Sequence, residues 1–269
     1  MTKKPNKLDA LRERYEKQKA KTAGEGDFSE KYLNIKLNET VEFRILPLSD
    51  DVADYLVETG KHYVDDDTKV NCPRVDGGKC PICDVYFDVW KSINEIGDER
   101  NNESPLTLEL LALAKASKMT SRYYYNVLDR RDGKVKILTQ GYKVYAKILD
   151  GQFNQDWGNG EVSVADPKNG WDFALTLKKV KDYNNYDTST FRVKSTVLGT
   201  DAEIKQYMDE RHDLTEFAQL PEYGELKLIA ENLSATHKSL LAPSETAGME
   251  PTTGSGIDSE QDFIDSLGN

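Results

Sequence analysis

The chain has 269 residues, of which 31% are charged, a mean hydropathy of −0.68 and a formal net charge of −11. This length is sufficient for a hydrophobic core in one large domain or two small ones. The opening segment MTKKPNK lacks the apolar centre of a secretory signal, and no apolar run approaches the roughly 20 residues of a membrane span. We therefore expect a cytosolic protein that does not enter a membrane.

The overall acidity argues against a nucleic-acid partner, but the charge is unevenly distributed. Residues 1–22 carry a net charge of +5, residues 115–147 carry +7 and residues 178–194 carry +3. Residues 242–269 contain six Asp or Glu and neither Lys nor Arg. This pattern of basic patches followed by an acidic tail keeps nucleic acid among the candidate partners.

The first predicted element is a helix over residues 7–21, whose apolar residues form one narrow stripe among charged ones. The stripe is too thin to fold alone, and the Gly-Glu-Gly at 24–26 indicates a hinge. We expect a basic N-terminal arm over residues 1–26, followed by a core over residues 27–241.

Three β-like runs open the predicted core, at residues 32–37, 40–47 and 55–64. Asn38-Glu39 forms a tight connection between the first two. The third run leads directly into the segment that holds the cysteines.

All three cysteines lie within twelve positions, and a histidine precedes them. His62, Cys72, Cys80 and Cys83 supply the four donors of a closed tetrahedral zinc site, with a Cys-Pro-Ile-Cys knuckle bringing two of them together. A disulfide framework would leave one thiol over, and clustered reduced cysteines more often bind metal in a cytosolic protein. We predict one structural Zn²⁺ per chain, with ordinary reduced thiols as the alternative.

Catalytic zinc chemistry fits the sequence less well. A nucleobase deaminase requires a Glu two residues after the histidine, and Val64 stands there. No other His, Glu or Asp set has ligand or acid–base spacing. His212 and His237 fall in charged helical segments, and we expect both side chains to be exposed.

Beyond the cysteines, helical spacing predicts a helix over residues 84–96, whereas residues 105–116 fit either a helix or a buried strand. A hairpin is predicted over residues 122–138, because Asp132-Gly133 is a turn pair between two β-prone runs.

Alternating patterns then predict strands over residues 171–180 and 191–197, and helical patterns cover 201–218 and 222–240. Pro, Ser, Thr and Gly dominate from residue 242 onward, which predicts a disordered acidic tail over 242–269. The fold class is therefore α+β, a strand-rich core with helical additions.

Tyrosines are mixed with cations in the two basic segments of the core. Tyr123, Tyr124, Tyr125, Tyr142 and Tyr145 lie in the first segment, and Tyr183 and Tyr186 lie in the second. Any one tyrosine is most simply a core or edge residue whose hydroxyl reaches water. The set as a whole is typical of single-strand binding, in which bases stack on aromatic rings and cations follow the phosphates.

These parts resemble the zinc-containing single-stranded DNA-binding proteins, or helix-destabilising proteins, of T-even-like tailed bacteriophages. The similarity lies in FSEKYLNIKLNETVEFRILP (28–47), the His-Cys-Cys-Cys set with its CPIC knuckle, KMTSRYYYNVL (118–128) and NGWDFALTLKKVKDYNNYDTSTF (169–191). The acidic tail completes the pattern.

The resemblance implies a non-enzymatic protein that binds single-stranded DNA cooperatively and without sequence preference. It implies roles in phage DNA replication, recombination and repair, in the cytoplasm of the infected bacterial host. The implied core is an OB-fold, a five-stranded β-barrel, with a zinc-bearing subdomain at about residues 55–120 and helical additions. The basic arm would mediate self-association along DNA, and the acidic tail would contact replication and recombination proteins.

The resemblance also implies site residues. The family's DNA-stacking positions correspond to Tyr123, Tyr183, Tyr186 and Tyr124, the last being Trp in the family. With the cations of the same segments, the predicted DNA-binding set is Lys118, Arg122, Tyr123, Tyr124, Lys143, Tyr183, Tyr186 and Arg192. The partner-binding part of the tail is predicted at Asp262, Phe263, Ile264, Asp265 and Leu267.

A second functional class stays open alongside DNA binding. A protein-interaction module could use its acidic surface for partners, with zinc only as a staple and no direct role on DNA. Preference for single strands over duplex would separate the two classes.

Overall fold

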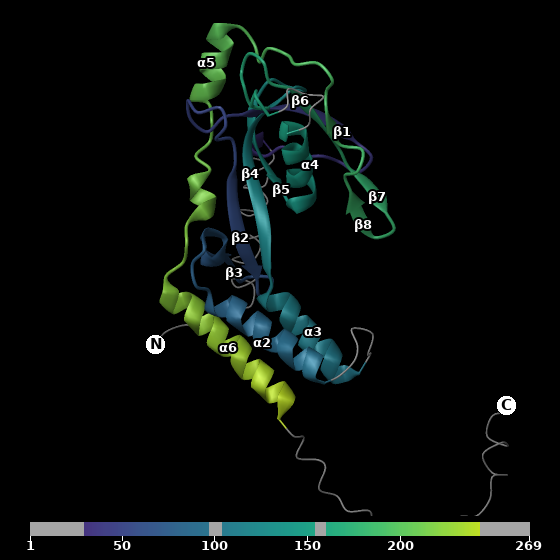
Figure 1. Cartoon of the computed structure of the whole chain (residues 1–269), viewed down its shortest axis with the longest axis vertical. Coiled ribbons are helices and arrows are strands. Elements are labelled where there is room, and N and C mark those ends of the chain that lie inside the picture. The colour runs from purple at the N-terminus through teal and green to yellow at the C-terminus, as the bar shows by residue number, and fades with distance from the viewer. Residues whose placement is uncertain (1–29, 97–103, 154–159, 243–269) are drawn as a thin grey trace, which may run out of the picture.

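The computed structural model describes residues 30–96, 104–153 and 160–242. In these residues the protein is an α+β structure, as predicted, with helices α2 to α6 and strands β1 to β9 (Figure 1). The predicted arm over 1–26 lies outside the described residues, as does the predicted tail over 242–269 apart from Ala242. None of the described helices is both long and apolar enough to cross a membrane.

The main sheet has the strand order β3-β2-β4-β1-β6-β9, with β5 paired to β4. Its strands are β1 (Thr40–Leu46), β2 (Val57–Tyr63), β3 (Lys69–Cys72), β4 (Met119–Asp129), β5 (Val135–Gln140), β6 (Asp172–Thr176) and β9 (Thr190–Phe191). Along one edge, β4 pairs first with β2 through residues 119–124 and then with β1 through 126–129. Its other edge pairs with β5 through residues 123–128. Strand β4 is therefore the centre of the sheet.

The β4–β5 hairpin confirms the predicted hairpin and its turn. The amide of Asp129 donates to the carbonyl of Lys134 at 3.0 Å, and Gly133 adopts φ = 68°, which a side chain would disfavour. The buried Asp129 carboxylate accepts hydrogen bonds from Arg131 and Lys136, each at 2.8 Å. These charge-assisted bonds fix the turn to the end of β4.

The prediction of a strand over residues 32–37 is wrong. Tyr32 forms a single bridge to Ile137, and the following backbone then leaves the sheet. The amide of Lys36 donates to the Glu39 side chain at 2.7 Å, and Asn38 has φ = 63°. The side chain thus takes the bond that a strand would have offered to a neighbour.

The two later strand predictions are correct only in part. The run 171–180 is divided into β6 and β7 (Lys178–Val180), and β7 pairs with β8 (Tyr183–Asn185) in a separate hairpin. Of the run 191–197, only Phe191 belongs to a strand. The amide of Thr196 bonds to the Gly170 carbonyl at 3.0 Å, and the backbone of this segment pairs with a loop instead of a strand.

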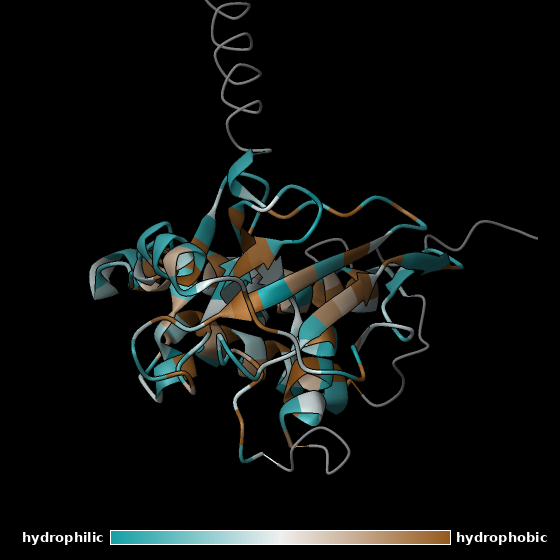
Figure 2. Cartoon of the chain, turned by 90° about the horizontal axis from the view of Figure 1, so that it is seen from above, coloured by the Kyte–Doolittle hydropathy of each residue, from teal (hydrophilic) through white to brown (hydrophobic). Residues whose placement is uncertain are grey.

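One core lies between the sheet and α4 (Tyr142–Phe153). It contains fully buried apolar residues from β1, β4 and β6, closed by Val144 and Ile148 of α4. Viewed from above, the central strands carry much of the brown apolar colour, and hydrophilic residues dominate much of the periphery (Figure 2). Burial of this kind contributes roughly 25 cal/mol per Å² of apolar surface.

A second core lies among α2 (Pro81–Glu95), α3 (Pro105–Ser117) and α6 (Tyr223–Leu241), at the lower end of the sheet in Figure 1. The structure thus resolves residues 105–116 as helix and confirms the helices predicted over 84–96 and 222–240. His237 corrects one expectation, because it is buried between α6 and α2 with its Nε2 atom 3.0 Å from the Ser92 hydroxyl.

The helix predicted over residues 201–218 is interrupted. It consists of α5 (Asp201–Asp209) and a short 3-10 helix, η3 (Thr215–Ala218), with irregular backbone between them. Asn126 of β4 causes this break, since its side-chain amide bonds both the N–H and the carbonyl of His212 at 2.9 Å. His212 is half-buried by this contact rather than exposed.

Candidate metal centre and nucleic-acid interface

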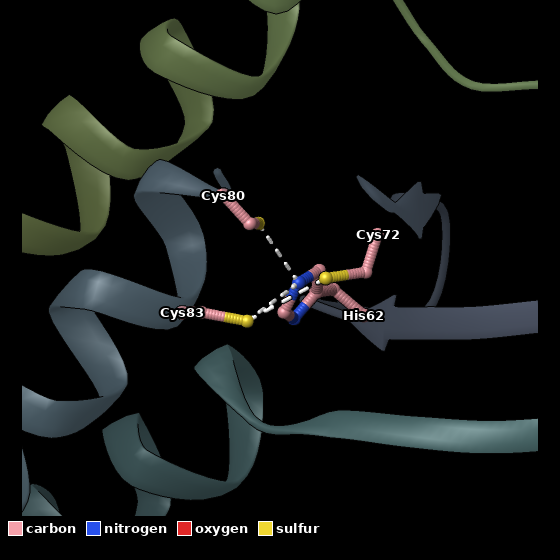
Figure 3. A group of neighbouring side chains, drawn as sticks. All are labelled: His62, Cys72, Cys80 and Cys83. Atoms are coloured by element: carbon pink, nitrogen blue, oxygen red, sulfur yellow. Dashed lines mark hydrogen bonds between the residues drawn. The ribbon is translucent and has the colours of Figure 1, made fainter. Parts of the chain in front are cut away.

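His62, Cys72, Cys80 and Cys83 converge where β2, β3 and α2 meet (Figure 3). His62 belongs to β2 and Cys72 ends the neighbouring strand β3. Cys80 immediately precedes α2 and Cys83 lies in its first turn, because Pro81 begins the helix directly after the knuckle. A β-hairpin and a helix start therefore supply two donors each.

The four donor atoms all lie within 4.8 Å of one another. The Nε2 atom of His62 is 3.3 Å from the sulfur of Cys80 and 3.7 Å from that of Cys83. The sulfurs of Cys72 and Cys83 are 3.5 Å apart. A tetrahedral zinc with Zn–S of about 2.3 Å and Zn–N of about 2.0 Å separates its donors by about 3.5–3.8 Å. The donor set therefore fits a tetrahedral ion of this size.

The other ring nitrogen of His62 is held by the end of α3. Its Nδ1 atom lies 3.0 Å from the carbonyl oxygen of Ser117, which can only accept a hydrogen bond. In the neutral ring Nδ1 therefore carries the proton, and Nε2 is the nitrogen that faces the sulfurs of Cys80 and Cys83 and can bind a metal ion. Orienting contacts of this kind fix the tautomer and the ring plane of metal-binding histidines.

Without a metal ion, hydrogen bonds couple the titration of the histidine to that of the cysteines. Burial lowers the pKa of His62, but hydrogen bonds with Cys80 and Cys83 outweigh it and raise the value to about 9. Hydrogen bonds with Cys72 and Cys83 lower the pKa of the Cys80 thiol, whereas those with Cys80 and Cys83 raise the pKa of Cys72. Cys80 is therefore the cysteine that loses its proton most readily. A metal ion that binds here would displace the protons that remain on His62 and Cys72.

The surroundings of the cluster indicate a structural role. All four side chains are buried, with Cys83 the most exposed at 4%. Gly60, beside Cys72, allows this close packing, since a side chain there would bring its Cβ atom within 2.7 Å of the Met119 sulfur. Four protein donors in an apolar enclosure can hold a metal ion, and they fill its tetrahedral positions.

A groove of about 340 Å³ lies among β4, the end of β5, the start of α4 and β8. Three predicted DNA-binding residues line it together: Arg122, Lys143 and Tyr186. The other residues of the wall are mainly polar or aromatic: Thr139, Gln140, Gly141, Tyr142, Val144 and Asn184.

The two cations of the groove come from different elements. Arg122 projects from β4, and its Nε atom donates to the hydroxyl of Tyr63 at 3.0 Å. Lys143 is exposed in the first turn of α4 and has no ion pair among the described residues. One cation is thus oriented by a neighbour and the other is open to an anionic ligand.

The β7–β8 hairpin forms one side of the groove and stands out from the body of the protein (Figure 1). Lys181 in its turn has φ = 55°, and every side chain of β7 is exposed. Tyr183 is 75% exposed at the tip, whereas Tyr186 is half-buried against the core. The anchored ring of Tyr186 lines the groove with the cations, whereas the open ring of Tyr183 lies on the hairpin outside the groove wall.

Two tyrosines of the predicted DNA-binding set lie elsewhere. Tyr123 is 3% exposed and stacks on Tyr145 at 3.9 Å between ring centroids. Tyr124 is 5% exposed and stacks on Phe217 of η3 at 4.3 Å. One face of each ring is already occupied by a protein ring, and neither residue lines the groove.

The remaining predicted residues are distributed around the molecule. Lys118 is exposed between α3 and β4. Arg192 is exposed and forms an ion pair with Glu42 of β1, outside the groove. The predicted tail residues Asp262, Phe263, Ile264, Asp265 and Leu267 lie outside the described residues.

Several residues of these sites were absent from the sequence-based set, and four of them matter for the proposals below. Ser117 orients His62 through a backbone carbonyl, which no side-chain pattern reveals. The hydroxyl of Tyr63, at the end of β2, accepts a hydrogen bond from Arg122 on the neighbouring strand β4. Tyr142 and Asn184 were visible as members of basic, tyrosine-containing segments, but the sequence did not distinguish them from their neighbours.

The chain combines a buried Cys₃His cluster that could hold a metal ion with a basic, tyrosine-bearing groove, a combination that suits a nucleic-acid-binding protein. The chain belongs to the gp32-like DNA-binding protein family, because the family model "gp32 DNA binding protein like" matches residues 42–236. This confirms the family resemblance seen in the sequence.

Two curated relatives extend the comparison over most of the chain. The single-stranded DNA-binding protein of Enterobacteria phage T2 is 26% identical over 264 residues, covering 93% of this chain and 78% of the relative. The single-stranded DNA-binding protein of Enterobacteria phage T4 is 25% identical, with the same coverage.

Proposed function

We propose that this protein binds single-stranded DNA without sequence preference, through the groove beside the β7–β8 hairpin. The observation that carries the proposal is the convergence on one groove of Arg122 from β4, Lys143 from α4 and Tyr186 from the segment after β8. The family membership and the named activity of both phage relatives support it.

The chemistry of the groove suits a flexible, unpaired strand. Arg122 and Lys143 would neutralise phosphates, and the exposed ring of Tyr183 would stack on a base. Stacking accepts any base because each has a π face, and it contributes roughly 1–3 kcal/mol per base. Paired bases do not offer their faces, so duplex DNA would gain only the electrostatic part of the binding energy.

We propose that the metal at His62, Cys72, Cys80 and Cys83 is one structural zinc ion per chain. The donor set and spacing support this identity, since thiolate and imidazole in a tetrahedron suit zinc. The ion would join the β2–β3 hairpin to α2 and so hold the subdomain at about residues 55–120. No step of DNA binding passes through it.

We also propose that the sheet is an OB-fold. The pairing of β4 with β2 and then β1 along one edge supports this, because one long strand that serves two partners in succession requires a strongly curved sheet. In the described residues the strand order is open from β3 to β9, so closure of the barrel is part of the proposal.

The proposal extends to the two ends of the chain. Residues 1–26 would promote cooperative binding between neighbouring copies, and residues 242–269 would recruit phage replication and recombination proteins. The opposite charges of the two segments support these different roles. A basic segment can lie close to the DNA phosphates, whereas an acidic segment can compete with the phosphates for the basic groove. The protein would act in replication, recombination and repair, as a binding protein, in the cytoplasm of the infected host.

A fluorescence titration with oligo-dT and with duplex of equal length tests the central proposal. We expect tight binding to the single strand and much weaker binding to the duplex at moderate salt. Equal affinity for both, or no binding to either, would favour the protein-interaction module with an acidic surface.

A further inference from the structure

Tyr142 is the most exposed aromatic residue in the wall of the groove. It begins α4, its side chain is 67% exposed, and it adjoins Lys143 in the sequence.

The ring packs against one tyrosine, which in turn packs against a second tyrosine in the core. The centroid of Tyr142 lies 6.1 Å from that of Tyr145, with the planes tilted by 51°. Tyr145 in turn stacks on Tyr123 at 3.9 Å with an interplanar angle of 2°, and Tyr123 belongs to the buried core. The backbone beneath is anchored by Val144 and Ile148, which are each 1% exposed. Tyr142 therefore projects from a rigid base.

A cation and a polar side chain line the same groove as the ring. The Nη1 atom of Arg122 lies close to Gly141, the residue before Tyr142, since a Cβ atom built there would be 3.5 Å from it. Asn184 of β8 faces the groove from the hairpin. A nucleotide here would find the ring of Tyr142 for its base. For its phosphate it would find the guanidinium of Arg122, which lies beside Gly141, the residue before that ring.

We infer that Tyr142 is the aromatic platform on which a base of the single strand stacks in this groove, with Tyr145 and Tyr123 as its buried support. This inference rests on the proposed function and deepens it, because it transfers the stacking role expected of Tyr123 to a residue that solvent and DNA can reach. Tyr123 contributes to binding only by holding Tyr145 in place.

The test compares Tyr142→Ala, Tyr142→Phe and the control Tyr223→Ala. Tyr223 is also exposed, at 60%, but it lies in α6 and does not line the groove. Each protein is titrated with oligo-dT and with an oligonucleotide of equal length whose central nucleotides are abasic. The abasic strand keeps the phosphates and removes the bases, so it separates stacking from charge.

For Tyr142→Ala we expect the affinity for oligo-dT to fall between about 5-fold and 150-fold, the range that one stacked base represents. We expect an unchanged affinity for the abasic strand, an unchanged salt slope and an unchanged melting temperature. Tyr142→Phe and Tyr223→Ala should bind oligo-dT as the wild type does.

An equal loss on both strands would overturn the inference, because it would assign Tyr142 a contact with the backbone. Unchanged binding of Tyr142→Ala to oligo-dT would overturn it as well, while leaving the proposed function intact if the wild type binds. Failure of the wild type to bind oligo-dT would overturn both.

Discussion

The carbonyl oxygen of Ser117 lies 3.0 Å from the Nδ1 atom of His62, and this contact joins the metal cluster to the strand that forms the groove. Ser117 is the last residue of α3, and β4 begins two residues later at Met119. A metal ion bound at His62 would thereby fix the point at which the chain enters β4, the strand that also carries Arg122. A structural ion can support DNA binding in this way without touching DNA.

Removal of one ligand of the proposed metal should destabilise the subdomain at about residues 55–120 more than the region that forms the groove. For Cys83→Ser we expect metal content to fall from one ion per chain toward zero, measured by elemental analysis. Structural zinc contributes on the order of 10 kcal/mol of apparent folding free energy in small domains, so the melting temperature should fall strongly. Lys91→Ala, at an exposed position of the same helix, is the matched control. Full metal content in Cys83→Ser would remove Cys83 from the site.

The groove cations should be recognisable from the salt dependence of binding. The slope of log K against log salt for single strands is roughly −0.7 per neutralised phosphate. We expect Lys143→Ala and Arg122→Ala each to make the slope shallower by about 0.7, if each residue meets one phosphate. Tyr183→Ala should instead lower affinity at every salt concentration and leave the slope unchanged.

Lys227→Ala provides the control for these variants, since Lys227 is exposed on α6, far along the chain from the groove, and pairs only with Glu231 among the described residues. A wild-type slope in both groove variants would place the phosphate contacts on another surface.

Asp129 should make the stability of the sheet depend on pH. Burial raises the pKa of its carboxyl group, but hydrogen bonds from Arg131 and Lys136 outweigh burial and lower it from 3.8 to about 2. A lowered folded-state pKa gives stability that is complete above about pH 4 and is lost as the pH falls through about 2. Asp129→Asn should therefore reduce the free energy of unfolding by on the order of 2 kcal/mol at pH 7, as measured by urea denaturation.

The difference between wild type and Asp129→Asn should shrink as the pH is lowered toward 2. Asp50→Asn, an exposed position, serves as the control and should match the wild type throughout. A constant difference at all pH values would show that the variant acts through packing rather than through charge.

The sequence predicted that His62 and the three cysteines lie together, because the signal for this cluster is local. His62, Cys72, Cys80 and Cys83 are rare residues with characteristic spacing, and any fold that closes the knuckle brings two of them together. The hairpin at Gly133 and the helices α2 and α6 were predicted for the same reason, since turn pairs and helical periodicity depend only on residues that are close together in the sequence.

The aromatic contacts could not be assigned from the sequence, because their exposure depends on distant segments. Alternation along β4 separates Tyr123 from Tyr124, but it identifies a groove-facing side only if one face of the strand is open. Here α4 covers one face through Tyr145, and η3 covers the other through Phe217. Both covering elements are distant in the sequence from these two tyrosines. The burial of Tyr123 and Tyr124 therefore depends on the tertiary structure and cannot be read from the local sequence.

The N-terminal arm should be required for cooperativity but not for binding itself. We expect deletion of residues 1–22 to leave the affinity for a short oligonucleotide intact, because the groove is built entirely from later residues. Saturation of poly-dT by this variant should lose its sigmoidal form, because contacts between neighbouring copies would be missing. Equal cooperativity with and without the arm would assign self-association to the core.

The acidic tail should compete with DNA for the groove. Six carboxylates without Lys or Arg, joined to α6 by a Pro-, Ser-, Thr- and Gly-rich stretch, can reach over much of a domain of this size. Truncation after Ala242 should therefore raise the affinity for single strands, most strongly at low salt where charge competition is least screened. It should also lower the temperature at which the protein melts duplex DNA.

Two further variants separate charge from docking in the tail. Replacement of its six carboxylates by amides should reproduce the gain in affinity, whereas alanine at Phe263, Ile264 and Leu267 should not. The alanine variant should instead lose partner proteins in a pull-down from infected-cell lysate, because the apolar residues between the charges would form the docking surface. A truncated protein whose salt-dependent affinity equals that of the full chain would contradict the competition and leave only the docking role.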